Sequence, residues 1–210
     1  MNVAIELHGV TKRYGSTLVI KELTHTFAAG TCTAVVGHNG SGKSTLIKLL
    51  SGQSIPSKGT LTSQGMDSEE WALRVALSAP YTELLEEFTP LEFFQWQKKF
   101  RSFRNRLNPE DVAARLELPM QALHRPISTF SSGMKQRVKL AAACFSDTPI
   151  LLLDEPFSNL DADARRWGHE TIHDSLIPSE KWGERLVVIA SNADAEETAH
   201  CSHTLPLPKF

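Results

Sequence analysis

The sequence has no long hydrophobic run and almost no net charge, and each absence excludes a class of protein. Its longest apolar runs, at Ile150–Leu153 and Leu186–Ala190, are the size of single strands, whereas a membrane-spanning helix needs about 20 apolar residues. The formal charge of −2 provides no general attraction to nucleic acid or to anionic lipid. We therefore expect neither a transmembrane segment nor a nucleic-acid partner.

Cysteine is scarce as well. The three cysteines, Cys32, Cys144 and Cys201, show no C-x-x-C spacing and have mostly apolar neighbours, as is typical of free thiols in a reducing compartment. The first residues, Met1–Glu6, lack the basic start and apolar segment of a secretory signal. Both features favour a cytoplasmic protein whose cysteines have no redox role.

A glycine-rich run at residues 37–45 follows the apolar stretch Cys32–Val36 and precedes the periodic stretch Leu46–Leu50. This order predicts a strand, a loop and a helix. The run fits G-x-x-x-x-G-K-[ST], in which glycines let consecutive N–H groups turn toward a polyphosphate at a helix N-terminus. The residues expected to bind nucleotide are Gly37, His38, Asn39, Gly40, Ser41, Gly42, Lys43, Ser44 and Thr45.

Within this loop, Lys43 is expected to reach the β- and γ-phosphates and Ser44 to ligate Mg²⁺. The alternative is a Gly/Ser-rich turn that joins a strand to a helix and binds nothing. The three glycines, the Lys-Ser pair and both flanking elements agree on the nucleotide interpretation.

The rest of the chain predicts an α/β fold with a mostly parallel sheet, an N-terminal antiparallel β edge and an inserted helical subdomain. Short strands are predicted at Ala4–Val10, Leu18–Ile20 and Gly59–Thr62, a turn at Phe27–Gly30, and the pattern at Ser68–Leu77 is ambiguous. Residues 80–146 show helical spacing, with prolines at 90, 109, 119 and 126 as breakers. We expect a single domain, 1–210, with its core in 1–79 and 147–210 and a helical subdomain in 80–146.

Two carboxylates, Asp154 and Glu155, follow the apolar run Ile150–Leu153 directly. Such a run is typical of a parallel strand buried on both faces, and ligands bind at the carboxyl ends of these strands. The pattern resembles the second nucleotide motif of P-loop ATPases. That resemblance implies that Asp154 holds Mg²⁺ and that Glu155 polarises the attacking water.

A second small-residue turn, Phe-Ser-Ser-Gly-Met-Lys-Gln-Arg at residues 130–137, opens an amphipathic stretch. It resembles the signature of ABC ATPases, in which backbone amides and a helix dipole face an anion. The resemblance implies that Ser131 and Gly133 close over the γ-phosphate of ATP bound by a second ATPase subunit. It also implies that Tyr14 stacks on adenine and that Asp161, in the segment 158–161, belongs to the loop through which subunits communicate.

The resemblance covers nearly the whole chain and implies an ATP-hydrolysing subunit of an ABC transporter. Its cofactors are ATP and Mg²⁺, and its partners are an integral membrane permease and a second ABC ATPase subunit, identical or different. It is expected on the cytoplasmic face of the cell membrane. The acidic stretch 83–92 is the candidate docking surface for the permease.

Two positions depart from the family pattern. The glutamine expected near residue 80 is replaced by Pro80, so its metal contact is lost, replaced by water, or supplied by Tyr81 or Glu83. Asn192 occupies the place of the switch histidine, with Lys43 and Glu155 as the other catalytic residues. An amide can bind a γ-phosphate oxygen but cannot become cationic, so slow hydrolysis is expected.

Two histidine motifs are interpreted as chance. Residues 169–173 match the H-E-x-x-H pattern of zinc proteases but follow the communication loop, and no third ligand is evident nearby. His200, Cys201 and His203 are spaced too tightly for a standard zinc module, which favours a surface turn. Two functional alternatives stay open: a soluble ABC ATPase acting on ribosomes or DNA, and an ATP-binding partner with little turnover.

Overall fold

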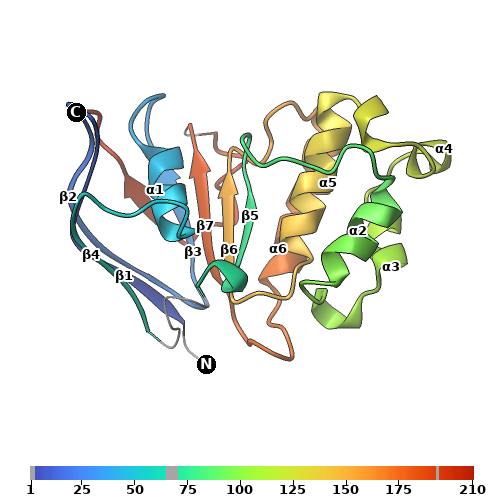
Figure 1. Ribbon diagram of the computed structural model, residues 1–210, viewed down its shortest axis with the longest axis horizontal. Helices are drawn as coiled ribbons and strands as arrows, with labels where there is room; N and C mark the ends of the chain where they lie inside the picture. The colour runs from blue at the N-terminus through green and yellow to red at the C-terminus, as the bar shows by residue number, and fades with distance from the viewer. Residues whose placement is uncertain (1–2, 65–70, 193) are drawn as a thin grey trace.

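The computed structural model describes residues 3–64, 71–192 and 194–210, and places them in two sheets flanked by helices (Figure 1). The smaller sheet is antiparallel with the order β2-β1-β4. Its strands are β1 (Ala4–Tyr14), β2 (Thr17–Ala28) and β4 (Lys58–Gln64). This sheet is the β edge predicted for the N-terminal part of the chain.

The larger sheet is parallel with the order β5-β6-β7-β3-β8. Its strands are β3 (Cys32–Val36), β5 (Val75–Ser78), β6 (Ile150–Asp154), β7 (Leu186–Ser191) and β8 (His203–Pro206). The α/β class and the parallel sheet are confirmed. Because β6, β7 and β3 are neighbours, their carboxyl ends bring residues from three distant parts of the sequence to one edge.

Strand β6 is buried on both faces, which explains why its sequence is a continuous apolar run and does not alternate with polar residues. Leu151 and Leu153 pack into one hydrophobic cluster, while Ile150 and Leu152 pack into another on the opposite face. Helix α1 (Lys43–Leu50) covers one face and lies between the two sheets, whereas α5 (Ser132–Cys144) and α6 (Ala162–Leu176) cover the other (Figure 1). A strand covered on both faces needs apolar side chains in both directions.

The region predicted as helical contains α2 (Pro90–Lys98), α3 (Pro109–Ala114) and α4 (Met120–Leu123) before α5. Short 3₁₀ turns occur at η1 (Trp71–Arg74), η2 (Arg104–Arg106) and η3 (Ile127–Thr129). The four prolines predicted as breakers stand at helix beginnings, where a missing N–H costs nothing. Among the helices of the described residues, none has the length and apolarity to cross a bilayer.

Strand β8 corrects one prediction. His203, which is expected in a surface turn, instead begins β8, which pairs in parallel with β3. The strand is short and mostly exposed, so it carries no apolar pattern to reveal it. Of the ambiguous segment Ser68–Leu77, residues 68–70 lie outside the described residues, and the remainder forms η1 and β5.

The N-terminal hairpin is longer than predicted. Strand β2 runs to Ala28, so Phe27 and Ala28 belong to the strand and not to a turn. Between Ile20 and Phe27 the only apolar residue of the strand is Leu23, so the sequence signal for a strand is weak there. Phe27 is buried against the cluster that also holds α1, so the hairpin fixes the helix that follows the glycine-rich loop.

Candidate functional site

The glycine-rich loop joins β3 to α1, and its backbone requires glycine at specific positions. Gly42, the N-cap of α1, has a φ of 96°, and a Cβ there would lie 2.9 Å from a methyl group of Val19. Gly40 has a φ of 82°. The first turn of α1 contains no acidic residue, so its free N–H groups and helix dipole present positive potential to the loop.

The first residue of α1 and the residues that follow β6 and β7 form one polar chain. The Lys43 ammonium is almost fully buried and donates to the Asn192 Oδ1 atom at 2.7 Å, and to the Gly37 and His38 carbonyls at 2.8 and 3.2 Å. The Asn192 Nδ2 atom donates to the Glu155 carboxylate at 2.6 Å. The amide of Asn192 therefore bridges the loop lysine and the carboxylate at the end of β6.

Asp154 is buried beside this chain, and neither of its carboxylate oxygens has a hydrogen-bond partner among the described residues. Burial raises the pKa of Asp154 and the Glu155 charge adds to the rise, whereas the Ser44 hydroxyl, Lys43 and Lys48 act in the opposite direction. A buried carboxylate without donors, next to an exposed hydroxyl, is a donor set that suits a hard divalent cation. Asp154 and Ser44 thus fit Mg²⁺.

A cavity of about 470 Å³ lies over the loop and collects most of the predicted nucleotide-binding residues. It is lined by Tyr14, Val19, Asn39, Gly40, Gly42, Lys43, Ser44, Thr45, Glu155 and Asn192. Tyr14 is half exposed on β1, with the Lys12 ammonium 5.0 Å from its ring centroid. The aromatic face of Tyr14 suits a base, and the ammonium of Lys43 with the N–H groups of the loop suits a polyphosphate.

Three predicted loop residues do not line this cavity. Gly37 and His38 turn their carbonyls to Lys43 instead. Ser41 is buried with a hydroxyl that has no partner among the described residues. A Cβ on Gly37 would lie 2.5 Å from that hydroxyl, so glycine is required there to let the loop close on itself.

The small-residue turn at the start of α5 forms a separate site. Ser131 caps the helix by accepting from the Met134 N–H at 3.3 Å, and a Cβ on Gly133 would lie 2.9 Å from the Asn159 carbonyl. Asp161 likewise caps α6 by accepting from the Ala164 N–H at 2.8 Å. These residues line a cavity of about 280 Å³ that shares no residue with the loop cavity. Within one chain, they are therefore not brought to the nucleotide loop.

The segment around the missing glutamine places an aromatic ring near the acidic end of the site. The Lys48 ammonium lies 4.4 Å from the centroid of the Tyr81 ring. Burial raises the pKa of Tyr81, and the nearby charge of Asp154 adds to the rise. Pro80 is exposed and its carbonyl accepts from Lys139 at 3.3 Å. Tyr81 and Glu83, the two side chains considered as replacements for the glutamine, both line a cavity separate from the loop cavity. Of the two, Tyr81 lies within electrostatic reach of Asp154.

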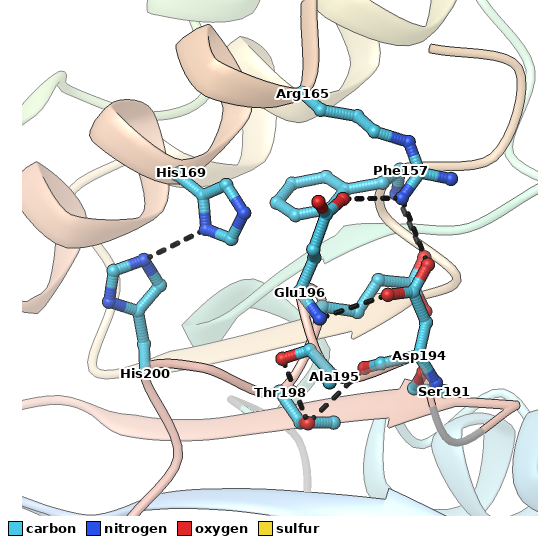
Figure 2. A network of polar contacts seen from close by, with 10 residues as sticks. Phe157, Arg165, His169, Ser191, Asp194, Ala195, Glu196, Thr198 and His200 are labelled. Carbon is cyan, nitrogen blue, oxygen red and sulfur yellow. Dashed lines mark hydrogen bonds and ion pairs between the residues drawn. The ribbon is translucent and has the colours of Figure 1, made fainter. Parts of the chain in front are cut away.

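Figure 2 shows a polar network between α6 and the segment that follows β7, which the sequence did not reveal. Arg165 of α6 reaches Asp194 at 2.9 Å and Glu196 at 2.7 Å. Glu197 is buried and accepts from the Phe157 N–H at 3.0 Å, which fixes the turn that follows Glu155. A pair of glutamates in a polar segment is typical of a solvated turn, so no sequence signal identifies this buried one.

The H-E-x-x-H motif lies on α6, where His169 Nδ1 is 3.4 Å from His200 Nε2 (Figure 2). The His173 and His200 ring centroids are 6.0 Å apart. Within the part of the chain that the structure describes, no group of three His, Cys, Asp or Glu residues has the arrangement to hold a metal ion. Among the described residues, the motif therefore lacks the ligand set of a zinc protease.

The sequence pattern of ABC transporter proteins matches residues 20–158. The Nod factor export ATP-binding protein I of Rhizobium leguminosarum bv. viciae is 36% identical over 171 residues, which cover 78% of this chain and 54% of that protein. The chain thus spans about half the length of this relative. The uncharacterised ABC transporter ATP-binding protein YybJ of Bacillus subtilis strain 168 is 32% identical over 196 residues, covering 90% of this chain and 86% of the relative.

A solved structure of a dimeric bacterial ABC transporter cassette shares the fold, with a TM-score of 0.78 at 22% identity. The similarity covers 97% of this chain and 94% of that structure. It includes both sheets and the helical segment between β5 and β6, since nearly all of each chain is aligned.

Proposed function

The chain belongs to the ABC transporter family of ATP-binding proteins, and from this premise we propose that it binds and hydrolyses ATP to drive a separate integral membrane permease. The observation that supports this most is the polar chain from Lys43 through Asn192 to Glu155, which ends beside the buried Asp154. A site built only to bind nucleotide has no need of a second carboxylate held at the strand end.

In the proposed reaction, the residues position groups and stabilise charge. Lys43 and the N–H groups of the loop hold the phosphates, while Ser44 and Asp154 hold the metal. Mg²⁺, when bound, neutralises the developing charge on the phosphate oxygens. Glu155 accepts a hydrogen bond from the attacking water and orients it for in-line displacement. The Asn192 Nδ2 group has a second N–H beside the one it gives to Glu155, and this N–H would donate to the γ-phosphate.

We propose that a second ABC ATPase subunit, identical or different, completes the site. Ser131 and Gly133 stand at the N-terminus of α5 and face a cavity away from their own nucleotide loop. In a head-to-tail dimer they would close over the partner's ATP, with Asp161 at the interface. The dimeric state of the related cassette supports this arrangement.

The proposed location is peripheral, on the cytoplasmic face of the cell membrane, where the permease would hold the subunit. The whole chain, 1–210, would act as one domain, with the core in 1–79 and 147–210 and the helical subdomain in 80–146. The acidic residues of 83–92 remain the proposed docking surface for the permease.

The test compares ATP hydrolysis by the wild-type protein with the Glu155→Gln variant, in the presence of the membrane fraction. We expect the substitution to abolish hydrolysis and to leave ATP binding intact, because Gln preserves shape but cannot accept the proton of water. Equal rates in the two proteins would support the alternative of an ATP-binding partner with little turnover, which the replacements at Pro80 and Asn192 favour.

A second experiment separates the transporter from the soluble ATPase. The protein is purified from membranes and the proteins that accompany it are identified. Recovery of an integral membrane protein is expected. Recovery of ribosomal proteins or DNA would instead support the soluble ABC ATPase that acts on ribosomes or DNA.

A further inference from the structure

Two cysteines that are 169 positions apart in sequence meet at the edge of the parallel sheet. The Cys32 and Cys201 sulfur atoms are 2.9 Å apart, and both thiols are free. We propose that Cys32 and Cys201 are a dithiol modification site, which an oxidant of the peroxide class converts reversibly to an intramolecular disulfide. The proposal is independent of the proposed transport function.

Strand pairing brings the two sulfur atoms close together. Cys32 begins β3 and Cys201 comes just before β8, which pairs with β3 in parallel register. The Ser202 N–H donates to the Cys32 carbonyl at 2.9 Å, so the backbones are hydrogen-bonded at this point. Neighbouring strands lie about 5 Å apart, which is within the Cα separation that a disulfide spans. The backbones at this point are therefore close enough for a disulfide to join them.

The segment before Cys201 is anchored on α6. Arg165 points toward Asp194 and Glu196, and His169 points toward His200 (Figure 2). These contacts hold the chain immediately N-terminal to Cys201. The sulfur is therefore presented to Cys32 persistently, which raises the effective concentration of one thiol at the other far above that of an external thiol.

Exposure determines which thiol reacts first. Cys32 is 6% exposed, whereas Cys201 is partly open to solvent. The hydrogen bond to Cys201 and burial raise the pKa of Cys32, so Cys32 is the poorer nucleophile toward an external oxidant. Cys201 is thus the residue that meets the peroxide, and Cys32 is the resolving thiol.

The chemistry balances with one peroxide. The Cys201 thiolate attacks one oxygen of hydrogen peroxide, the O–O bond breaks, and a sulfenic acid and hydroxide form. The Cys32 sulfur then attacks the sulfenic sulfur, the S–O bond breaks, and the hydroxide leaves as water after taking a proton. In total, two thiols and one peroxide give one disulfide and two waters. A dithiol reductant restores the thiols.

The disulfide would join the beginning of β3, the strand that leads into the nucleotide loop, to the segment that enters β8, its neighbour in the sheet. At the far end of β8, the Leu207 N–H donates to the Val36 carbonyl at 2.8 Å, and a Cβ on Gly37 would lie 2.7 Å from the Leu207 carbonyl. Asn192 is only nine positions before Cys201. The disulfide would therefore restrict the motion of the segment between Asn192 and Cys201. It would do so at the beginning of β3, whose other end leads into the nucleotide loop.

The test maps the oxidised thiols. The purified full chain is treated with hydrogen peroxide, free thiols are blocked, and the protein is digested with trypsin without reduction. The three cysteines fall on separate tryptic peptides, 22–43, 140–165 and 186–209. We expect peptides 22–43 and 186–209 joined within one chain, with loss of the link after reduction by dithiothreitol. Nonreducing electrophoresis should show a monomer.

Two variants and one probe complete the experiment. Cys144 is fully buried and burial raises its pKa to about 12, so Cys144→Ser should leave the link unchanged. In Cys32→Ser, Cys201 lacks its resolving thiol and should proceed to the sulfinic acid. Phenylarsine oxide, which bridges two thiols with release of water, should bind wild type and not Cys32→Ser. The proposal is overturned if peroxide gives only sulfinic Cys201 in wild type, a link to Cys144, a link between chains, or no link.

Discussion

Lys43 donates a hydrogen bond to Asn192 across 2.7 Å, although the two residues are 149 positions apart in the sequence. The contact exists because β3 and β7 are neighbours and both end at the same edge of the sheet. It also orients the Asn192 amide: with Oδ1 facing the ammonium, Nδ2 must face Glu155. A neutral amide thereby stands between a cation and a carboxylate, at the place where a histidine is expected from the family resemblance.

The first prediction concerns this amide. We expect Asn192→His to raise the ATP turnover number at least about tenfold, since a positioned acid-base residue contributes about 10²–10⁴-fold and asparagine cannot carry a proton. Turnover is measured with the permease present, and Asn192→Ala serves as the control that removes the amide without adding an ionisable group. Equal turnover of wild type and Asn192→His would show that the amide does not limit the rate.

The second prediction concerns Asp154 in the absence of metal and nucleotide. Burial raises the pKa of Asp154, so its ionised carboxylate destabilises the folded chain at neutral pH, and an amide of the same shape removes that charge. We expect Asp154→Asn to raise the melting temperature of the free protein, by about 2–4 °C for each kcal/mol. Differential scanning calorimetry in EDTA measures it. Glu155→Gln, which changes a carboxylate that already has a partner, should shift the melting temperature less.

A fall in the melting temperature of Asp154→Asn would mean that the Asp154 carboxylate has stabilising partners in the folded protein. The description of its two oxygens as free to bind a cation would then be wrong.

The third prediction separates backbone strain from steric clash at two glycines. Gly42 and Gly15 both have positive φ, but a Cβ would meet Val19 at 2.9 Å only at Gly42. We expect Gly15→Ala to cost about 1 kcal/mol in the free energy of unfolding, from strain alone, and to retain ATP binding. Gly42→Ala should cost more and abolish ATP binding, because the loop must move away from β2. Urea unfolding and nucleotide titration measure both effects.

If Gly42→Ala bound ATP as tightly as Gly15→Ala, the loop backbone would not be the phosphate cradle.

The fourth prediction is a pH dependence that belongs to Glu197. Burial raises its pKa above the ordinary value of 4.5, so the folded state binds the proton more tightly than the unfolded state. Its contribution to stability is therefore full below pH 4.5 and is lost as the pH rises through the raised pKa. We expect the free energy of unfolding of Glu197→Gln to exceed that of wild type increasingly over this window.

One proton limits that slope to about 1.4 kcal/mol per pH unit. Glutamine can still accept from the Phe157 N–H, so the difference reports the charge and not the hydrogen bond. Parallel stability curves for the two proteins across the window would contradict the buried, proton-binding carboxylate.

The nucleotide loop and the strand-end carboxylates were predictable because their chemistry is local. Residues 37–45 carry their backbone requirement in their glycines, and the apolar run before Asp154 requires a buried strand whose end meets the loop. The helix beginnings at Pro90 and Pro109 are local too, since each follows a capping residue that reaches the backbone three positions on.

What could not be predicted depends on pairing between distant segments. Arg185 follows a glutamate and precedes a strand, as a surface residue does, yet it is buried and donates to the Cys144, Ser146 and Thr148 carbonyls at the end of α5. Strand β8 has no apolar periodicity, and its pairing with β3 is what brings Cys201 to Cys32. A sequence pattern records neither the partner strand nor the register.

The measurement that bears most directly on the proposed site is calorimetric titration of ATP into the protein with and without Mg²⁺. For wild type we expect one ATP per chain, bound more tightly with Mg²⁺, since Asp154 and Ser44 present oxygen ligands to the metal. For Asp154→Asn the Mg²⁺ effect should vanish, and for Lys43→Met binding itself should be lost. Binding of ATP that is equal in all three proteins, or indifferent to Mg²⁺ in wild type, would contradict the site.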